Sequence, residues 1–336
     1  MTINFEHRVA AHCETGVTSN MMNFYGYQLS EAMIFGIGEG LIFIYLPFIP
    51  FKGNSLKFSF RSFPGSIFAR ALKKLNVKIG MKRFVNKEEA MKEMDKLLAL
   101  GIPVGNVVGL FHLPYSPVRV HFNAHNLCVV GKEGDEYIIS DPCWHSTLLN
   151  ISYNDLLRVR FSQGAFKPRG KMYWIKEKPV IVNVSCLIEK SIKNTCKRMI
   201  GAPFVSFYGV RGIVTMSKQI RKLEAKYGKK DALQFLASLT QAIEEIGTGG
   251  AGYRYMYGLF LYEAAELLNE PKLIKYSLEM NCIGDLWREL ALECGRKFKN
   301  RTNASYNDLA DKVLEIAETE KKFFVALKKE KLNNNN

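Results

Sequence analysis

The chain lacks an apolar run long enough to cross a bilayer. The longest such run, Leu41 to Phe51, is interrupted by Pro47 and Pro50 and is far shorter than the ~20 residues that a membrane-spanning helix needs. The first residues also lack the basic and apolar segments of a secretory signal. We therefore expect a protein that is not transmembrane and that is located in the cytoplasm.

Cysteine and histidine spacings of the kinds that hold disulfides or zinc are also absent. The seven cysteines are an odd number, and they form none of the close pairs that mark a disulfide framework or a zinc site. This pattern favours free thiols in a reducing compartment. It predicts no bound metal.

The charge of the chain is strongly one-sided. Lys and Arg number 47 against 32 Asp and Glu, which gives a formal net charge of +15. Such a surplus attracts acidic partners. No helix-turn-helix, zinc finger or aromatic RNA-binding strand accompanies it, so nucleic acid is not the expected partner. The alternative, in which lysines only solvate exposed helix faces, stays open.

The pattern along the chain changes near Glu177-Lys-Pro179. The 336 residues are enough for roughly two domains. We predict an α+β domain over 1–178, a mostly helical domain over 179–330 and a disordered tail over 331–336. The helices predicted in the second part cover 184–200, 215–227, 230–246, 253–269, 271–281, 283–299 and 305–328, with Ser305 and Asp308 as a capping box for the last.

Helices and strand-like runs are mixed in the first part. The turn Lys132-Glu-Gly134-Asp predicts a hairpin between two of the strands. Asn86 and Glu89 are a capping pair at the start of a helix. Helices are predicted over 15–25, 66–75 and from Asn86 to Gly101, and strands over 103–111, 118–130, 137–140 and 171–176.

Cys13 stands at the start of the first predicted helix. The positive end of a helix dipole favours the thiolate, which is the nucleophilic form of cysteine. All six histidines lie in the first 145 residues, which suggests that the acid–base chemistry belongs to the N-terminal half. A structural interpretation stays open, because a free cysteine is often a small buried hydrophobe.

His125 lies in one strand-like run and Asp141 ends the next. A hairpin brings the start of one strand beside the end of the other, so the Asp141 carboxylate would orient the His125 imidazole and hold its tautomer. Pro142 fixes the chain direction just after it. Cys13, His125 and Asp141 are therefore the predicted nucleophile, base and orienting group of an acyl-transfer site.

Two stretches resemble known families. His121 to Pro142 resembles the His-strand-turn-strand-Asp-Pro segment of papain-like, bacteriocin-processing-type cysteine peptidases. The N-terminal stretch is similar to a narrower family, the butirosin biosynthesis H acyltransferases. The matching features are the His-Cys-x-Thr opening at His12, a Tyr-Gly helix end, the Ser30-Glu31 pair, a Phe-Gly-x-Gly-x-Gly run before Tyr-x-Pro and, further on, Gly249-Gly250-x-Gly252-Tyr-Arg254 and Phe260 to Ala264.

The resemblance implies a papain-like N-terminal domain and a helical C-terminal domain. It implies that Cys13 takes an acyl or aminoacyl group from the phosphopantetheine thioester of an acidic acyl carrier protein. His125 would deprotonate the thiol and later activate a small-molecule amine acceptor, and Asp141 would orient His125. The phosphopantetheine is then part of the donor substrate, with no cofactor bound by the protein itself.

Oxyanion stabilisation is expected from the backbone N–H of Cys13 and one side chain. Papain-like enzymes place a glutamine at the position that His7 occupies here. His7 could donate from its ring, or the oxyanion hole could be built differently, and both interpretations stay open. His12, beside the nucleophile, would shape the pocket or simply pack.

Two glycine runs are candidate substrate contacts. Gly36, Gly38 and Gly40 precede no helical pattern, which argues against a dinucleotide fingerprint and favours a tight turn or close approach to a substrate. Gly250 and Arg254 open a predicted helix and could bind an anion such as a phosphate. A plain connection between helices is the alternative for the second run.

Two rival functions use the same residues. A cysteine peptidase or amidase would hand the acyl group to water, and a non-catalytic scaffold for a carrier protein would leave Cys13 unreactive. The lack of a secretion signal and the large helical domain favour transfer to an amine. The sequence leaves open the acyl chain, the acceptor, the pathway and whether the protein is a homo-oligomer.

Overall fold

The computed structural model describes residues 3–50, 57–180, 183–245 and 249–332. Contacts between Cα atoms divide the chain into two units, Met1–Ile34 with Pro64–Val182, and Phe35–Phe63 with Asn183–Asn336. The predicted domains are continuous segments, whereas a segment of the second unit interrupts the first in the sequence. Most of the predicted tail, residues 333–336, lies outside the described residues.

A six-stranded antiparallel sheet forms the centre of the first unit. Its strand order is β3-β8-β4-β5-β6-β7. The strands are β3 (Ile79–Lys82), β4 (Val104–Val108), β5 (His125–Glu133), β6 (Glu136–Ser140), β7 (Leu149–Ser152) and β8 (Met172–Ile175). The predicted hairpin is confirmed, because β5 and β6 pair up to Glu133 opposite Glu136.

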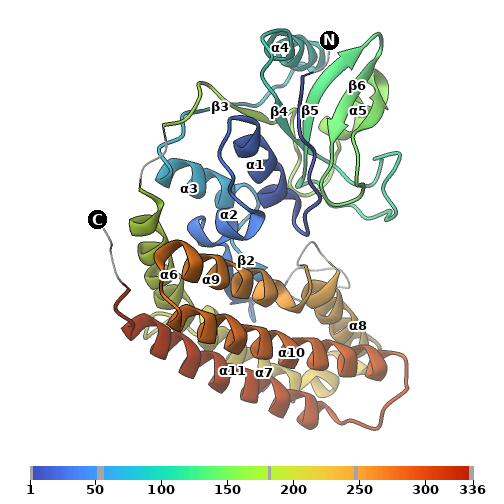
Figure 1. The fold of residues 1–336 in the computed structure, drawn as a ribbon. Coiled ribbons are helices and arrows are strands. Elements are labelled where there is room, and N and C mark those ends of the chain that lie inside the picture. Colours follow the sequence, from blue (N-terminus) through green and yellow to red (C-terminus); the bar gives the residue numbers. More distant parts are fainter. Residues whose placement is uncertain (1–2, 51–56, 181–182, 246–248, 333–336) are drawn as a thin grey trace. The chain divides into compact units, whose positions relative to one another are not determined.

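The helices of the first unit are placed around this sheet (Figure 1). They are α1 (Cys13–Phe24), α2 (Glu31–Ile37), which crosses the boundary between the units, α3 (Ser66–Lys74), α4 (Lys87–Ala99) and α5 (Tyr153–Arg160). Helix α1 is buried from Cys13 to Asn23 and packs against β5. A helix that is covered on all sides is part of the core, so the start of α1 is held rigidly beside the sheet.

The strand predicted over 118–130 is wrong in its first part. Residues 118–124 have no regular structure, and β5 begins only at His125. Pro114 and Pro117 lie just upstream and lack the N–H that a strand interior needs. His125 is therefore the first residue of its strand, where the chain leaves an irregular loop.

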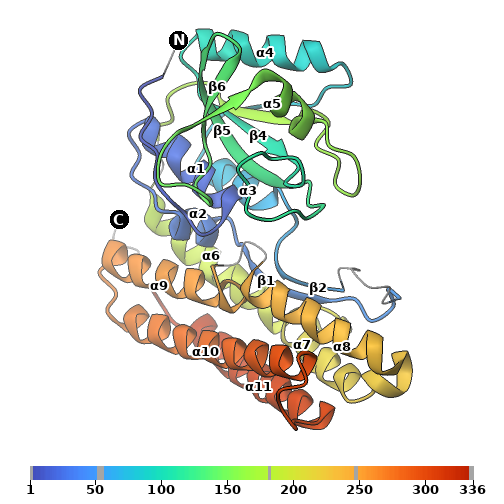
Figure 2. The ribbon, with the colours of Figure 1, turned by 90° about the vertical axis from the view of Figure 1, so that its right-hand side faces the viewer.

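The second unit is built mainly from helices. These are α6 (Val184–Ile200), α7 (Gly209–Ile220), α8 (Leu223–Glu244), the short 3₁₀ helix η1 (Ala251–Tyr253), α9 (Arg254–Leu268), α10 (Lys272–Phe298) and α11 (Tyr306–Lys329), with the hairpin strands β1 (Leu41–Tyr45) and β2 (Phe58–Arg61). Helices α9, α10 and α11 run side by side (Figure 2). The capping box predicted at Ser305 and Asp308 is confirmed.

The helices predicted over 271–281 and 283–299 are a single helix, α10. No proline lies between Cys282 and Phe298 to end a helix, and Gly284 has a packing role. A Cβ on Gly284 would lie 2.7 Å from the Tyr255 ring, so the glycine lets α9 approach. Within the described residues, none of the helices combines the length and the apolarity needed to cross a bilayer.

Candidate active site

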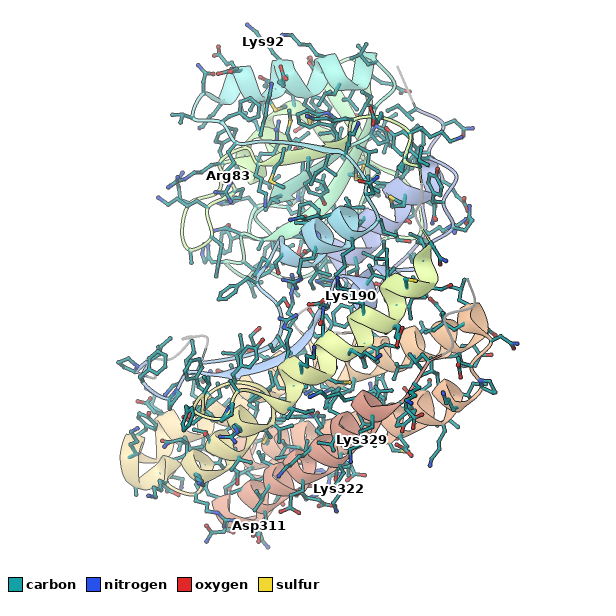
Figure 3. All side chains as sticks on the ribbon, turned by 90° about the vertical axis from the view of Figure 1, so that its left-hand side faces the viewer. Arg83, Lys92, Lys190, Asp311, Lys322 and Lys329 are labelled. Atoms are coloured by element: carbon teal, nitrogen blue, oxygen red, sulfur yellow. The ribbon has the colours of Figure 1, made fainter. Side chains whose placement is uncertain are left out.

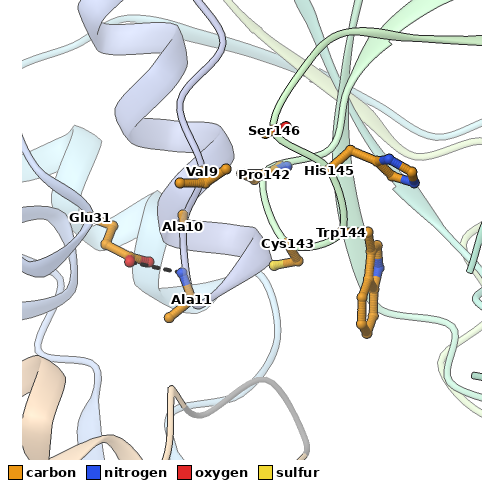
Figure 4. A pocket seen from close by; sticks show the side chains of 9 residues that line it. All are labelled: Val9, Ala10, Ala11, Glu31, Pro142, Cys143, Trp144, His145 and Ser146. Atoms are coloured by element: carbon orange, nitrogen blue, oxygen red, sulfur yellow. Dashed lines mark hydrogen bonds between the residues drawn. The ribbon is translucent and has the colours of Figure 1, made fainter. Parts of the chain in front are cut away.

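Glu31 holds the segment that leads into Cys13. Its carboxylate oxygens accept the backbone N–H of Ala11 at 2.8 Å and of His12 at 3.1 Å. Figure 4 shows the first of these bonds. His12 is the extended N-cap residue of α1, so Cys13 occupies the first position of the helix, where the dipole favours a thiolate.

The carboxylate of Glu14 lies at the start of α3. Its carboxylate accepts the backbone N–H of Gly65 and Ile67 at 2.9 Å and of Phe68 at 3.1 Å. An anion at a helix N-terminus is stabilised by the dipole and by the first-turn N–H groups. Glu14 therefore ties α1 to α3, and the charge of its carboxylate is compensated by α3.

His125 and Asp141 meet at the end of the β5–β6 hairpin. His125 Nε2 lies 2.7 Å from Asp141 Oδ2, and both side chains are buried. Burial lowers the pKa of His125, but the charges of Asp141 and Cys13 and hydrogen bonds to both raise it to about 10. Because Nε2 is engaged by Asp141, Nδ1 is the ring nitrogen left to face the thiol.

Two further groups hold the Asp141 carboxylate. The Tyr115 hydroxyl donates to Oδ2 at 3.0 Å, and the backbone N–H of Cys143 donates to Oδ1 at 3.2 Å. Burial and the neighbouring Asp141 raise the pKa of Tyr115 well above its ordinary value, so it remains a donor. Tyr115 was missed by the sequence reasoning, because it lies in the irregular loop between β4 and β5, where no spacing pattern applies.

A cavity of about 490 Å³ adjoins these residues. One wall is residues 9–11, which lead to Cys13, and the other is residues 142–146, which follow Asp141 (Figure 4). Cys143 lines the cavity, and a hydrogen bond to Cys13, together with burial, raises the pKa of its thiol. The lining residues are Val9, Ala10, Ala11, Glu31, Pro142, Cys143, Trp144, His145 and Ser146.

The ring of His7 is used for structure. Its Nε2 lies 3.0 Å from the backbone oxygen of His145, to which it must donate, and its Nδ1 lies 2.8 Å from Ser140 Oγ. With both nitrogens engaged, the interpretation of a differently built oxyanion hole is favoured over donation by His7. His12 is also buried, with its Nδ1 2.9 Å from Thr15 Oγ1.

Because Gly36 and Gly40 have no side chain, aromatic rings of the second unit can pack against their backbone. A Cβ on Gly36 would lie 2.2 Å from the Phe260 ring, and one on Gly40 would lie 2.3 Å from Phe35. Gly38 is in the turn that follows α2. The contacts of Gly36 and Gly40 are internal packing, which corrects the prediction that these two glycines bind substrate.

Arg254 belongs to a buried ion pair. Its Nε donates to Glu320 at 2.8 Å and its Nη1 to the Gly252 carbonyl at 2.7 Å. Trp287 Nε1 donates to the same Glu320 oxygen at 2.7 Å. Because Arg254 is fully buried against a carboxylate, the prediction of an anion site there is wrong. Gly250, at φ 86°, is the residue before η1.

Removing one partner of this pair is expected to destabilise the protein. Glu320→Gln leaves the Arg254 charge buried without its counter-charge, which should lower the free energy of unfolding by about 3–5 kcal/mol. Urea unfolding followed by circular dichroism measures the change. Glu318→Gln, an exposed position on the same helix, is the control, and an equal midpoint for both variants would contradict the prediction.

The fold and the site define a class. A cysteine at a helix N-terminus, packed on an antiparallel sheet that carries the histidine and aspartate, is the layout of papain-like cysteine enzymes. This confirms the predicted α+β fold with a papain-like N-terminal part.

Among the described residues, no three His, Cys, Asp or Glu side chains are grouped so as to hold a metal ion.

The family models identify the chain more narrowly. The model described as "Butirosin biosynthesis protein H, N-terminal" matches residues 12–142, and the model described as "Domain of unknown function (DUF4872)" matches residues 154–327, more than half of the chain. The chain belongs to the family that the DUF4872 model describes, and its N-terminal part matches the butirosin biosynthesis H-like family. The resemblance identified in the sequence is thereby confirmed.

The comparison with solved structures gives a weak likeness. A protein described as a C39-like peptidase from Bacillus anthracis is similar over 52% of this chain and 98% of its own, at 14% identity and a TM-score of 0.35. A likeness at this level carries no conclusion about chemistry. No curated protein matches the sequence.

Proposed function

We propose that the protein is a cysteine-dependent acyltransferase of biosynthesis, which moves an acyl or aminoacyl group from a carrier-protein thioester to an amine. The observation that carries the proposal is the meeting of Cys13, His125 and Asp141 in a chain whose N-terminal part matches the butirosin biosynthesis H-like family. The family's name supplies the biosynthetic setting, and the site supplies the chemistry.

In the first half-reaction Cys13 attacks the donor thioester. The raised pKa of His125 favours a resting pair of Cys13 thiolate and His125 imidazolium. The thiolate adds to the carbonyl carbon, and the tetrahedral intermediate expels the phosphopantetheine thiolate. The imidazolium protonates this leaving group, which leaves an acyl thioester on Cys13 and a neutral His125.

In the second half-reaction an amine attacks the acyl-enzyme. Neutral His125 accepts the proton from the amine nitrogen while the Cys13 thiolate leaves, which forms the amide and restores the ion pair. The backbone N–H of Cys13, in the first turn of α1, is the proposed oxyanion donor in both steps. The cavity of about 490 Å³ is in the size range of small-molecule sites, and we assign it to the acyl chain or the acceptor.

The proposed donor partner is an acidic carrier protein. The net charge of +15 includes exposed residues of both units, among them Arg83, Lys92, Lys190, Lys322 and Lys329 (Figure 3). Complementary charge speeds association and is screened by salt. No bound cofactor is needed, because the phosphopantetheine arrives on the donor.

Carrier binding is expected to weaken steeply with ionic strength. Raising the salt from about 0.05 M to 0.5 M shortens the screening length to a few ångströms, so the dissociation constant should rise at least about tenfold in fluorescence anisotropy with a labelled carrier protein. Lys92→Glu and Lys322→Glu, one in each unit, should differ in effect and identify the docking unit. Binding that does not respond to salt would remove this role for the charge.

The function is tested by intact-mass measurement of the protein with a panel of acyl-carrier thioesters. A covalent acyl adduct that is discharged faster by amines than by water supports the transferase. Discharge by water alone would favour the rival hydrolase, a peptidase or amidase. Carrier binding with an unreactive Cys13 would favour the non-catalytic scaffold.

A further inference from the structure

A second buried side chain reaches the sulfur of Cys13. Asn126, the residue after His125 on β5, places its amide Nδ2 3.9 Å from Cys13 Sγ. This distance is long for nitrogen and oxygen, but sulfur is a larger and softer acceptor. The roles of Cys13, His125 and Asp141 leave this contact unexplained, and an amide with 2% of its surface exposed must have its hydrogen bonds satisfied inside the protein.

The contacts of Asn126 fix which end of the amide faces the thiol. The Tyr173 hydroxyl donates to Asn126 Oδ1 at 3.0 Å, and Asn126 Nδ2 also donates to the Ala124 carbonyl at 3.1 Å. A flipped amide would place its oxygen against that carbonyl, and two acceptors cannot form a hydrogen bond with each other. The N–H₂ end therefore points at Cys13.

The sheet is built so that Tyr173 can reach Asn126. Tyr173 on β8 pairs with Gly105 on β4, and Gly105 pairs with Cys128 on β5. A Cβ on Gly105 would lie 2.3 Å from the Tyr173 ring, so the ring crosses β4 over the glycine. Phe68 stacks on the ring at 4.4 Å between centroids.

The surroundings of Cys13 make a neutral donor useful. Glu31 interacts with Cys13 as a like charge, and Cys143 and His125 each form a hydrogen bond with Cys13. Burial raises the pKa of Tyr173 well above its ordinary value, so Tyr173 stays a neutral donor. Burial and a nearby carboxylate disfavour a thiolate, whereas hydrogen bonds to the sulfur favour it.

We propose that Asn126 is a catalytic residue, whose amide N–H stabilises the Cys13 thiolate, and that Tyr173 is the positioning residue that directs this amide. The proposal deepens the proposed function and rests on Cys13 as nucleophile. A thioester sulfur is a weak acceptor, so the bond is strongest when Cys13 is a thiolate. Asn126 therefore acts on the attacking form in the first half-reaction and on the leaving group in the second.

The test needs no substrate. The rate at which iodoacetamide alkylates Cys13 is measured against pH from the mass of the Cys13 peptide, with the exposed Cys186 as reference in the same digest. For Asn126→Ala we expect the profile to move to higher pH by about one unit, which is a roughly tenfold slower reaction on its acid side. Tyr173→Phe, which keeps the ring, should move the profile in the same direction by less.

The control removes another buried asparagine from the sheet. Asn106 on β4 bonds to the Val104 carbonyl and to Met94, so Asn106→Ala should leave the profile in place. Profiles of Asn126→Ala and Tyr173→Phe that superimpose on the original would overturn the proposal. If Asn126→Ala does not fold, Tyr173→Phe decides alone. A wild-type Cys13 no more reactive than Cys186 would instead count against the proposed function.

Discussion

Replacing Cys13 with alanine is expected to abolish the acyl-enzyme and reduce amide formation to background. The thiolate is the proposed covalent carrier, and neither His125 nor the oxyanion donor can substitute for it. Intact-mass spectra after incubation with the acyl-carrier thioester should show an adduct on the wild type and none on Cys13→Ala. Retention of full transfer activity would overturn the assignment of the nucleophile.

The matched control for this variant is Cys143→Ala. Cys143 lines the cavity and shares a hydrogen bond with Cys13, so it is the neighbouring thiol that could carry an adventitious adduct. We expect Cys143→Ala to keep the acyl-enzyme. An adduct that survives in Cys13→Ala and disappears in Cys143→Ala would move the covalent step from Cys13 to Cys143.

Asp141→Asn is expected to slow transfer by roughly two to four orders of magnitude while carrier binding is retained. The carboxylate accepts the Nε2–H of His125 and stabilises the imidazolium, and an amide in its place favours the wrong tautomer. Single-turnover kinetics and a binding assay separate the two effects. The exposed Asp311→Asn is the control, and a near-normal rate for Asp141→Asn would make Asp141 structural.

The same variant should change the pH dependence. With Asp141 and Cys13 beside it, the pKa of His125 is raised to about 10. Its contribution to stability is therefore fully present below the unfolded pKa of about 6.5 and is lost as the pH rises through the folded value. Asp141→Asn removes one cause of the raised pKa, so His125 should lose its proton, and with it the ion pair with Cys13, at a lower pH. The rate of Cys13 alkylation measured against pH should show this transition at a lower pH than in the wild type.

Local signals predicted the elements that carry the proposed catalytic residues. The Lys132–Asp135 turn gave the hairpin that brings His125 to Asp141. The helix predicted over 15–25 is present as α1, which begins two residues earlier, at Cys13. The capping residue Asn86 accepts the N–H of Glu89 as expected. Turn and capping preferences act between residues a few positions apart, so one sequence is sufficient to read them.

Other residues took their roles from neighbours far away in the chain. Arg254 looked like an anion site at a helix start, but Glu320 comes from another helix and neutralises it. His7 stood where an oxyanion donor was expected, but Ser140 and His145 engage both ring nitrogens. No local pattern predicts such partners, because packing between distant segments decides them.

The sequence by itself predicted the α+β first part, the mostly helical second part and the family, and it proposed Cys13, His125 and Asp141 as the site, because periodicity, turns and motifs are local. Only the tertiary structure decided what surrounds the thiol. Glu31 comes from α2, Tyr115 from a loop, and Asn126 is directed by Tyr173 across the glycine of β4. Each of these contacts joins segments far apart in the chain, and it forms only when helices and strands pack into one core.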